Sequence, residues 1–153
     1  MAGWRVSRFV EERLRDTLTL VSRLNLPLAG IHGDYWAGNV LMEGDAVTGV
    51  VDWDEAHVDW RAYEVANATW QFCRNESSDA LDLKAAREFH RHYNAAGEGL
   101  TDPEREAVGP LIRARLLYEV LFTLGISGRG GEEDWEYVST NLNTLVNLRH
   151  VEV

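Results

Sequence analysis

The chain has 153 residues, of which 45% are hydrophobic, and this size and composition fit a single folded domain spanning residues 1–153. Its 25 acidic residues outnumber its 15 basic ones and give a formal net charge of -10, which disfavours nucleic acids and anionic membrane surfaces as partners. A single cysteine, together with the lack of a leader-like start or an apolar run of about 18 residues, predicts a cytoplasmic protein without an internal disulfide.

The first predicted element is an amphipathic helix. Apolar residues recur at steps of three and four from Arg5 to Asn25, and Pro27 ends the pattern. The aliphatic run Leu26–Ile31 then predicts a short strand.

A small hairpin is expected next. Its strands are the apolar segments Val40–Met42 and Val47–Val51, and residues 43–45 supply the turn between them. Loops at His32–Asn39 and Asp52–Asp59 flank this hairpin, so it carries polar residues at its base.

Beyond Trp60 the pattern is helical. Thr101 and Glu104 have the spacing of a capping box, which marks a helix start, while Gly109 and Pro110 are expected to break the long stretch that follows. The predicted fold class is therefore mainly α with a small β-hairpin, an α+β arrangement. The helical stretches are Tyr63–Phe72, Leu83–Tyr93, Pro103–Leu124 and Trp135–Leu148, with loops at 94–99 and 125–133.

Three polar residues stand out around the hairpin. Phosphoryl transfer requires a carboxylate that orients an attacking hydroxyl and accepts its proton, together with oxygen ligands for magnesium. Asp34, Asn39 five residues later, and Asp52 at the end of a buried strand follow the order in which a kinase catalytic loop presents these groups. The alternative is that these are three polar loop residues that cap strands, and the spacing and the flanking strands favour the catalytic reading.

The segment HGDYWAGNVL at residues 32–41, followed by VVDW at 50–53, resembles the H-G-D-x-x-x-x-N and I-D-[WF] signatures of the aminoglycoside phosphotransferase and choline kinase-like family. This resemblance implies a two-lobed, protein-kinase-like fold and ATP- and Mg2+-dependent phosphorylation of a small-molecule hydroxyl. It further implies that Asp34 is the catalytic base and that Asn39 and Asp52 bind the metal and cofactor. His32 would shape the catalytic loop, although a buried, hydrogen-bonded histidine without a chemical role is the favoured alternative.

Two further acids lie close to this motif. Asp54 could add an oxygen ligand to the metal or could be an ordinary solvated acid. The stretch DWRAYEVA, which begins at Asp59, resembles the family's D-P-x-x-D-L-A segment, and this would make Asp59 a structural or loop-capping acid. Asp52-Trp53-Asp54 also has the D-x-D form of haloacid dehalogenase-type phosphatases, but Ala56 and the expected lack of a parallel sheet disfavour that reading.

The sequence departs from the family ahead of the motif. Only 33 residues precede Asp34, and the single lysine of the chain is Lys84, so no glycine-rich loop or lysine-bearing strand for ATP phosphates is found. The chain looks like the C-terminal lobe alone, with the N-terminal nucleotide lobe absent. We therefore expect weak or no turnover by this chain alone. The alternative is a non-catalytic binding or dimerisation module, and either a homodimer or a separate N-lobe partner is possible.

The substrate is less defined by the sequence. The family's acceptors include aminoglycosides, choline, homoserine and sugars. Glu119 and the acidic residues 132–134 would suit a cationic acceptor, although an ordinary acidic surface explains them as well. The tryptophans near the motif are expected to be core residues rather than a stacking surface; they are Trp36, Trp53, Trp60 and Trp70.

Overall fold

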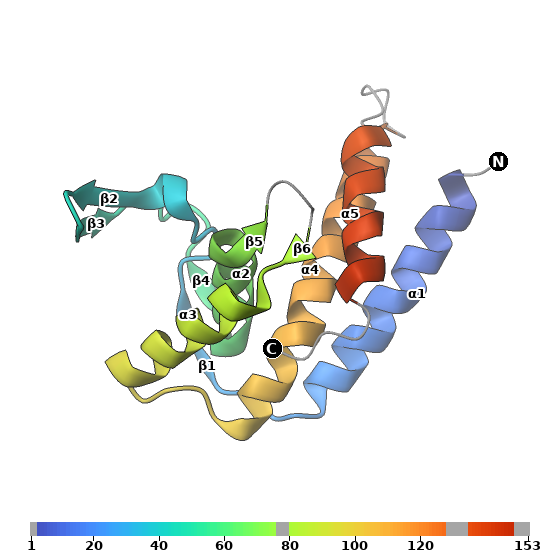
Figure 1. Ribbon diagram of the computed structural model, residues 1–153. Coiled ribbons are helices and arrows are strands. Elements are labelled where there is room, and N and C mark those ends of the chain that lie inside the picture. The colour runs from blue at the N-terminus through green and yellow to red at the C-terminus, as the bar shows by residue number, and fades with distance from the viewer. Residues whose placement is uncertain (1–2, 76–79, 128–134, 149–153) are drawn as a thin grey trace.

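The computed structural model describes residues 3–75, 80–127 and 135–148, and most of these residues are helical (Figure 1). The helical elements are α1 (Gly3–Ser22), the 3-10 turn η1 (Ala37–Asn39), α2 (Arg61–Cys73), α3 (Leu83–Ala96), α4 (Asp102–Ser127) and α5 (Trp135–Leu148). The strands are β1 (Leu28–Ile31), β2 (Val40–Glu43), β3 (Ala46–Val50), β4 (His57–Trp60), β5 (Arg74–Asn75) and β6 (Ala80–Leu81). The predicted class, mainly α with a small β-hairpin, is confirmed.

Helix α4 corrects one prediction. Gly109 and Pro110 do not break it, and a single helix runs from Asp102 to Ser127 with Pro110 inside. A proline within a helix costs about 3 kcal/mol, because it removes one hydrogen bond and crowds the preceding turn. Helix α4 packs against α1, α2 and α5. The burial of the residues around Pro110, such as Val108 and Leu111, in these contacts outweighs this cost.

The strands form two-stranded antiparallel sheets among the described residues. The predicted hairpin is β2 paired with β3, and it projects from the helical body (Figure 1). The loop predicted over Asp52–Asp59 is wrong in its second half, because residues 57–60 form β4 and pair with β1. The pair β5 and β6 was also not predicted, since each strand has only two residues.

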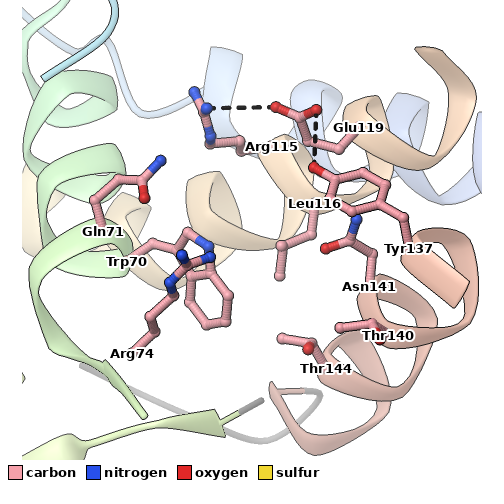
Figure 2. A pocket seen from close by; sticks show the side chains of 10 residues that line it. All are labelled: Trp70, Gln71, Arg74, Arg115, Leu116, Glu119, Tyr137, Thr140, Asn141 and Thr144. Carbon is pink, nitrogen blue, oxygen red and sulfur yellow. Dashed lines mark hydrogen bonds and ion pairs between the residues drawn. The ribbon is translucent and has the colours of Figure 1, made fainter. Parts of the chain in front are cut away.

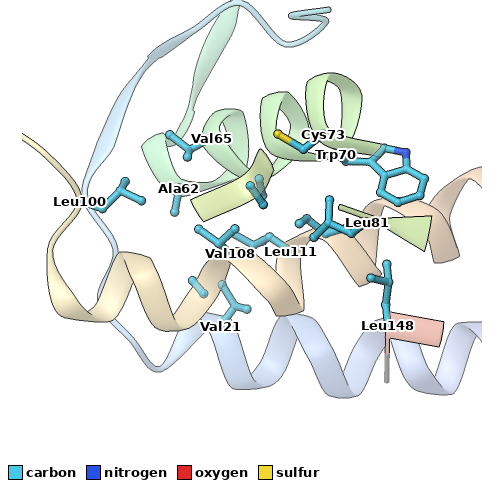
Figure 3. Packing of buried hydrophobic residues seen from close by; sticks show 14 of the residues in the cluster. Val21, Ala62, Val65, Trp70, Cys73, Leu81, Leu100, Val108, Leu111 and Leu148 are labelled. Atoms are coloured by element: carbon cyan, nitrogen blue, oxygen red, sulfur yellow. The ribbon is translucent and has the colours of Figure 1, made fainter. Parts of the chain in front are cut away.

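The hydrophobic core lies where α2 and α4 face each other, with α1 and α5 closing its edges (Figure 3). Leu111 of α4 is 1% exposed and packs in this cluster with Val65 and Trp70 of α2 and Val21 of α1. A second, smaller cluster joins α1, α4 and α5 around Val10 and its neighbours. Helix α2 is thus held on one side by the core, and its first turn contacts the loop that follows β1.

An ion pair fastens the start of α2 to the start of α4. Arg61 donates from Nε and Nη2 to the two carboxylate oxygens of Glu104, at 2.8 and 2.6 Å, and the Glu104 side chain is fully buried. The predicted capping box is confirmed, because the backbone N–H of Thr101 donates to Glu104 and the backbone N–H of Glu104 donates to the Thr101 hydroxyl. The bond from Arg61 lowers the pKa of Glu104 to about 2.

The tryptophan prediction holds for two of the four residues. Trp70 is buried and Trp60 packs partly buried against the core, but Trp36 and Trp53 are exposed and lie in the loops that flank the hairpin. No helix among the described ranges is both long and apolar enough to cross a membrane. The predicted loops begin too early: residues 94–96 are the end of α3, and residues 125–127 are the end of α4. The rest of the predicted loop 125–133 and the acidic residues 132–134 lie outside the described residues.

Candidate active site

The loop between β1 and η1 brings Asp34 and Asn39 into direct contact. Asn39 is buried, and its side-chain Nδ2 donates to the backbone carbonyl of Asp34 at 2.9 Å and to Asp34 Oδ2 at 3.2 Å. This closes the loop over five residues and fixes one oxygen of the half-buried Asp34 carboxylate. The other oxygen, Oδ1, remains for a group outside the loop.

Glu64, in the first turn of α2, holds the start of the same loop through its carboxylate. Its Oε1 accepts a hydrogen bond from the His32 backbone N–H at 2.8 Å, and its Oε2 accepts one from the Gly33 N–H at 3.3 Å. Hydrogen bonds to a carboxylate are stronger than those to neutral acceptors, so this acid fixes the start of the loop on a core helix. The sequence reasoning missed Glu64, although it lies in the DWRAYEVA stretch that was compared with the family.

The buried His32 ring joins the two loops at the base of the hairpin. Its Nδ1 accepts from the Asp34 backbone N–H at 3.3 Å, so its Nε2 carries the proton and donates to the Val51 carbonyl at 2.8 Å. Val51 directly precedes Asp52. The histidine ring therefore links the backbone at Asp34 to the residue before Asp52 through two hydrogen bonds.

Gly33 allows this tight geometry. Its φ of +86° is in the left-handed region, and a Cβ atom built on it would lie 2.5 Å from the Glu55 carbonyl oxygen. A residue with a side chain fits neither condition, so a glycine is required between His32 and Asp34.

Asn39 and Asp52 lie at the adjoining ends of β2 and β3. The Val51 N–H donates to the Asn39 carbonyl at 3.0 Å. This bond continues the backbone hydrogen bonds of the hairpin by one residue beyond the last strand pair, Val40 and Val50. Asp52 itself has a φ of +63°, a left-handed conformation that aspartate tolerates better than most residues. Its carboxylate is exposed and accepts no hydrogen bond from the residues that the structure describes.

The donors at this point suit magnesium. Because Asn39 Nδ2 is used by Asp34, its Oδ1 is the atom left for a cation, and Asp52 offers carboxylate oxygens. Nowhere in the described ranges do three His, Cys, Asp or Glu side chains gather as a metal cluster. Magnesium commonly takes only one or two protein ligands and fills the rest of its shell with water and phosphate, so this pair fits it.

The two other predicted acids lie at the edge of the site. Asp54 is exposed in the turn after Asp52. Asp59 is a local structural acid, since its Oδ1 accepts from the Trp60 N–H at 2.6 Å and its Oδ2 lies 3.6 Å from His57 Nε2. The hydrogen bond between His57 and the Glu55 carbonyl raises the pKa of His57.

A cavity of about 260 Å3 lies between the loop at residues 32–39, the adjoining strands and helices α2 and α3. Its wall is largely aromatic and includes the Trp53 ring, whose centroid is 4.7 Å from that of His32. The indole Nε1 of Trp53 donates to the Val50 carbonyl at 2.9 Å. The exposed Trp53 side chain is therefore held in place by a ring contact and a hydrogen bond.

The chain is similar in sequence and in fold to known proteins. Residues 3–107, more than half of the chain, match the sequence profile of the phosphotransferase enzyme family. A homoserine kinase of Zymomonas mobilis is 30% identical over 125 residues, which cover 80% of this chain and 34% of that protein. A homoserine kinase of Methylobacillus flagellatus is 35% identical over 106 residues, covering 69% of this chain and 32% of that protein. The chain thus spans about a third of the length of these relatives.

Two solved structures share the fold. A choline/ethanolamine kinase family protein from Mesorhizobium loti superposes with a TM-score of 0.71 at 19% identity, over 99% of this chain and 48% of that one. The ethanolamine kinase of Plasmodium vivax superposes with a TM-score of 0.66 at 16% identity, over 92% of this chain and 39% of that one. At this level of identity the likeness establishes the kinase-like fold.

Proposed function

We propose, because the chain belongs to the phosphotransferase enzyme family, that it carries the catalytic residues of a kinase that transfers phosphate from ATP to a hydroxyl group of a small molecule. The observation that carries this proposal is the direct contact between Asp34 and Asn39 beside the strand end that holds Asp52. In this arrangement one loop orients the acceptor and the other contributes to holding the metal.

Asp34 is the proposed base. Asn39 holds Oδ2, and Oδ1 is left to accept a hydrogen bond from the acceptor hydroxyl. As the oxygen of that hydroxyl attacks the γ-phosphate, its proton passes to the carboxylate. The backbone bonds to Glu64 and the His32 ring keep Asp34 in place, so it requires little reorganisation when the acceptor binds.

Magnesium is the proposed metal, held by Asn39 Oδ1 and the Asp52 carboxylate, with Asp54 as a further candidate ligand. When bound, it neutralises charge on the phosphates during transfer. Asp52 and Asn39 contribute by keeping their oxygens at the ends of one hairpin, where the backbone ladder sets their separation.

The acceptor proposed first is L-homoserine. The curated relatives described above are homoserine kinases, whereas the solved neighbours carry the names of ethanolamine and choline kinases at below 20% identity. All three compounds are small amino alcohols, and homoserine differs by its carboxylate.

A second lobe is part of this proposal. The relatives are about three times as long as the region they share with this chain, and several large apolar residues on the strands and on the loop after β3 are exposed. Such side chains suit a face that a nucleotide-binding lobe covers in the complete enzyme. They are Leu28, Leu41, Met42, Val47, Trp53 and Val58.

The test is whether the complete protein phosphorylates L-homoserine in the presence of Mg2+ and ATP. The products, ADP and phosphohomoserine, are measured. We expect Asp34→Asn to lower turnover by about 10²–10⁴-fold, the range for loss of a general base, without changing the thermal unfolding midpoint. Asp45→Asn, in the exposed hairpin turn, is the matched control and should leave turnover unchanged. Full activity in Asp34→Asn, or no transfer to any small amino alcohol, would contradict the proposal.

A further inference from the structure

Two cavities that border α2 differ in how their charged groups are paired. The larger one, of about 320 Å3, lies between α2, α4 and α5 (Figure 2). Its carboxylate, Glu119, is paired with Arg115 at 3.3 Å and accepts a hydrogen bond from the Tyr137 hydroxyl at 3.3 Å. The smaller one, the aromatic cavity of about 260 Å3, has Glu64 in its wall. Glu64 makes no ion pair within the described ranges, so of the two cavities the smaller presents the uncompensated carboxylate.

The Glu64 carboxylate keeps acceptor positions for a ligand. It is half-buried, and its two oxygens each accept one backbone N–H, from His32 and from Gly33. A carboxylate has about four acceptor positions, so both oxygens can accept a further hydrogen bond. Arg61, three residues earlier on α2, is paired with the buried Glu104 instead. Because a half-buried charge without a counter-charge is costly, this wall favours a positively charged ligand.

Aromatic rings form much of the remaining wall. An ammonium ion is attracted to the face of such a ring when it lies within about 6 Å of the ring centroid. The His32 ring centroid is 4.7 Å from that of Trp53 and 6.0 Å from that of Tyr35. Phe72 extends these contacts, since its centroid is 5.5 Å from that of Tyr35 and 6.3 Å from that of Phe89. The rings therefore hold one another in place around the cavity. Those that line it are Tyr35, Trp53, Phe89 and Tyr93, beside His32.

The size and the rest of the wall suit a hydrophobic group. An apolar cavity of about 150 Å3 is large enough to hold benzene, so the aromatic cavity has room for one ring that carries an ammonium group. The apolar residues of the wall come from β1, β3 and α2, and they are Gly30, Val50, Val65 and Ala68.

We propose that the aromatic cavity binds an organic cation, an ammonium ion carried by a hydrophobic group, at a site separate from that of the acceptor. The ammonium group binds Glu64 and the faces of the rings, and the hydrophobic group packs against Val65 and Ala68. Such a ligand needs no hydroxyl group and shares the Glu64 carboxylate with the backbone of the loop. Among the described residues, none of those proposed for catalysis lines this cavity; they are Asp34, Asn39 and Asp52.

The experiment measures binding to the complete protein by calorimetry at pH 7, without nucleotide, for benzylammonium, benzyl alcohol and benzoate. These compounds have similar size and differ in charge. We expect benzylammonium to bind at least about tenfold more tightly than benzyl alcohol, and benzoate to show no measurable binding, since the cation alone gains a charge-assisted hydrogen bond and cation–π contacts. Glu64→Gln should weaken benzylammonium about tenfold and leave benzyl alcohol unchanged.

Two variants block the cavity from opposite walls. A Cβ atom on Gly30 meets no atom within 4 Å, and Gly30 has no positive φ, so Gly30→Leu adds a side chain in open space. Ala68→Leu fills the cavity from α2. Each should weaken benzylammonium and benzyl alcohol by at least about tenfold. Ala95→Leu, on the exposed end of α3, is the matched control and should change neither affinity. Unfolding midpoints are measured for all three variants.

Asp34→Asn separates this site from a site beside the proposed base. It should leave the affinity for benzylammonium unchanged, whereas an amine bound next to Asp34 would lose affinity. Equal binding of benzylammonium and benzyl alcohol, a loss of affinity in Asp34→Asn, or full binding in both blocking variants would overturn the proposal. The measurement uses no turnover, so its outcome is independent of whether the chain is a kinase.

Discussion

The helical layer and the strands from Leu28 to Trp60 place their apolar side chains differently. Helices α2 and α4 bury theirs against each other, as Leu111 does at 1% exposure, whereas Leu41 on the hairpin is 48% exposed. The loop at residues 32–39 belongs to the strand region, yet its backbone is bonded to α2 through Glu64. The comparison indicates that burial in the helices stabilises the fold and that polar contacts hold the loop proposed to carry the catalytic base.

The largest stability effect is expected at the ion pair between α2 and α4. Glu104→Gln leaves Arg61 with only the exposed Glu98, 3.8 Å away, as a charged partner among the described residues, and we expect the free energy of unfolding to fall by about 3 kcal/mol. Chemical denaturation measures this. Glu88→Gln removes the partner of Arg91 on the exposed face of α3 and should give no measurable change. Equal effects in the two variants would contradict the distinction between buried and surface pairs.

A loss of similar size is expected in the core. Leu111→Ala should lower the free energy of unfolding by about 2–5 kcal/mol, since it leaves a cavity between α4 and α2. Leu41→Ala, the same change on the hairpin, should cost less than about 1 kcal/mol because the side chain is half exposed. If the hairpin variant were the more damaging of the two, the strands would be the source of stability.

Acid should act on the same ion pair. The pKa of Glu104 is lowered from 4.5 to about 2 in the fold, so the unfolded chain binds this proton more readily than the folded one. The stabilisation is present above pH 4.5 and is lost as the pH falls toward 2, by about 3 kcal/mol in total. Unfolding midpoints measured between pH 6 and pH 2 should fall less in Glu104→Gln than in the wild type.

A smaller loss of stability and a larger loss of activity are expected at the anchor of the loop. Glu64→Gln keeps one oxygen for the loop backbone and turns the other into a donor that faces an N–H group. We expect a loss of about 1–2 kcal/mol in unfolding free energy. Turnover should fall by about tenfold or more, because Asp34 shifts. Glu43→Gln on the exposed hairpin should change neither quantity.

The smallest stability effect is expected at Asp52. Asparagine accepts a φ of +63° as readily as aspartate, so Asp52→Asn should stay within about 0.5 kcal/mol of the wild type. It removes the charge proposed to bind magnesium, so turnover should require much more Mg2+. Asp52→Val should lose a further 1–2 kcal/mol, roughly, because a β-branched residue resists this backbone conformation. Unchanged Mg2+ dependence in Asp52→Asn would argue against its role as a ligand.

Local patterns in the sequence predicted much of this fold. The bounds of α5, Trp135–Leu148, and the capping box of Thr101 and Glu104 follow from residues a few positions apart. Strand β4 escaped prediction because it has only four residues, and although polar and apolar side chains alternate in it, so short a segment forms a strand only when β1, far away in sequence, pairs with it. Pro110 misled for a similar reason, since packing by three other helices holds α4 together.

The site divides in the same way. The contact between Asp34 and Asn39 follows from a spacing of five residues and could be anticipated, although the chemical roles of Asp34, Asn39 and Asp52 stay predictions. Glu64 reaches the loop from 31 and 32 residues away, which no local spacing reveals. The cavity of about 320 Å3 is lined by residues of α2, α4 and α5, so its position depends on how these helices pack and could not be predicted from local sequence patterns.

The pairing of strands in twos has a consequence for handling the molecule. In the part of the chain that the structure describes, β2 and β3 pair with no other strand, so each has an outer edge whose backbone N–H and C=O groups face no strand. An edge of this kind can accept a strand from another polypeptide, and apolar residues such as Val47 and Met42 favour such pairing. At high concentration the hairpin is therefore the segment from which aggregation of this chain is expected to start, and a lysine at Thr48 is the substitution of choice to prevent it.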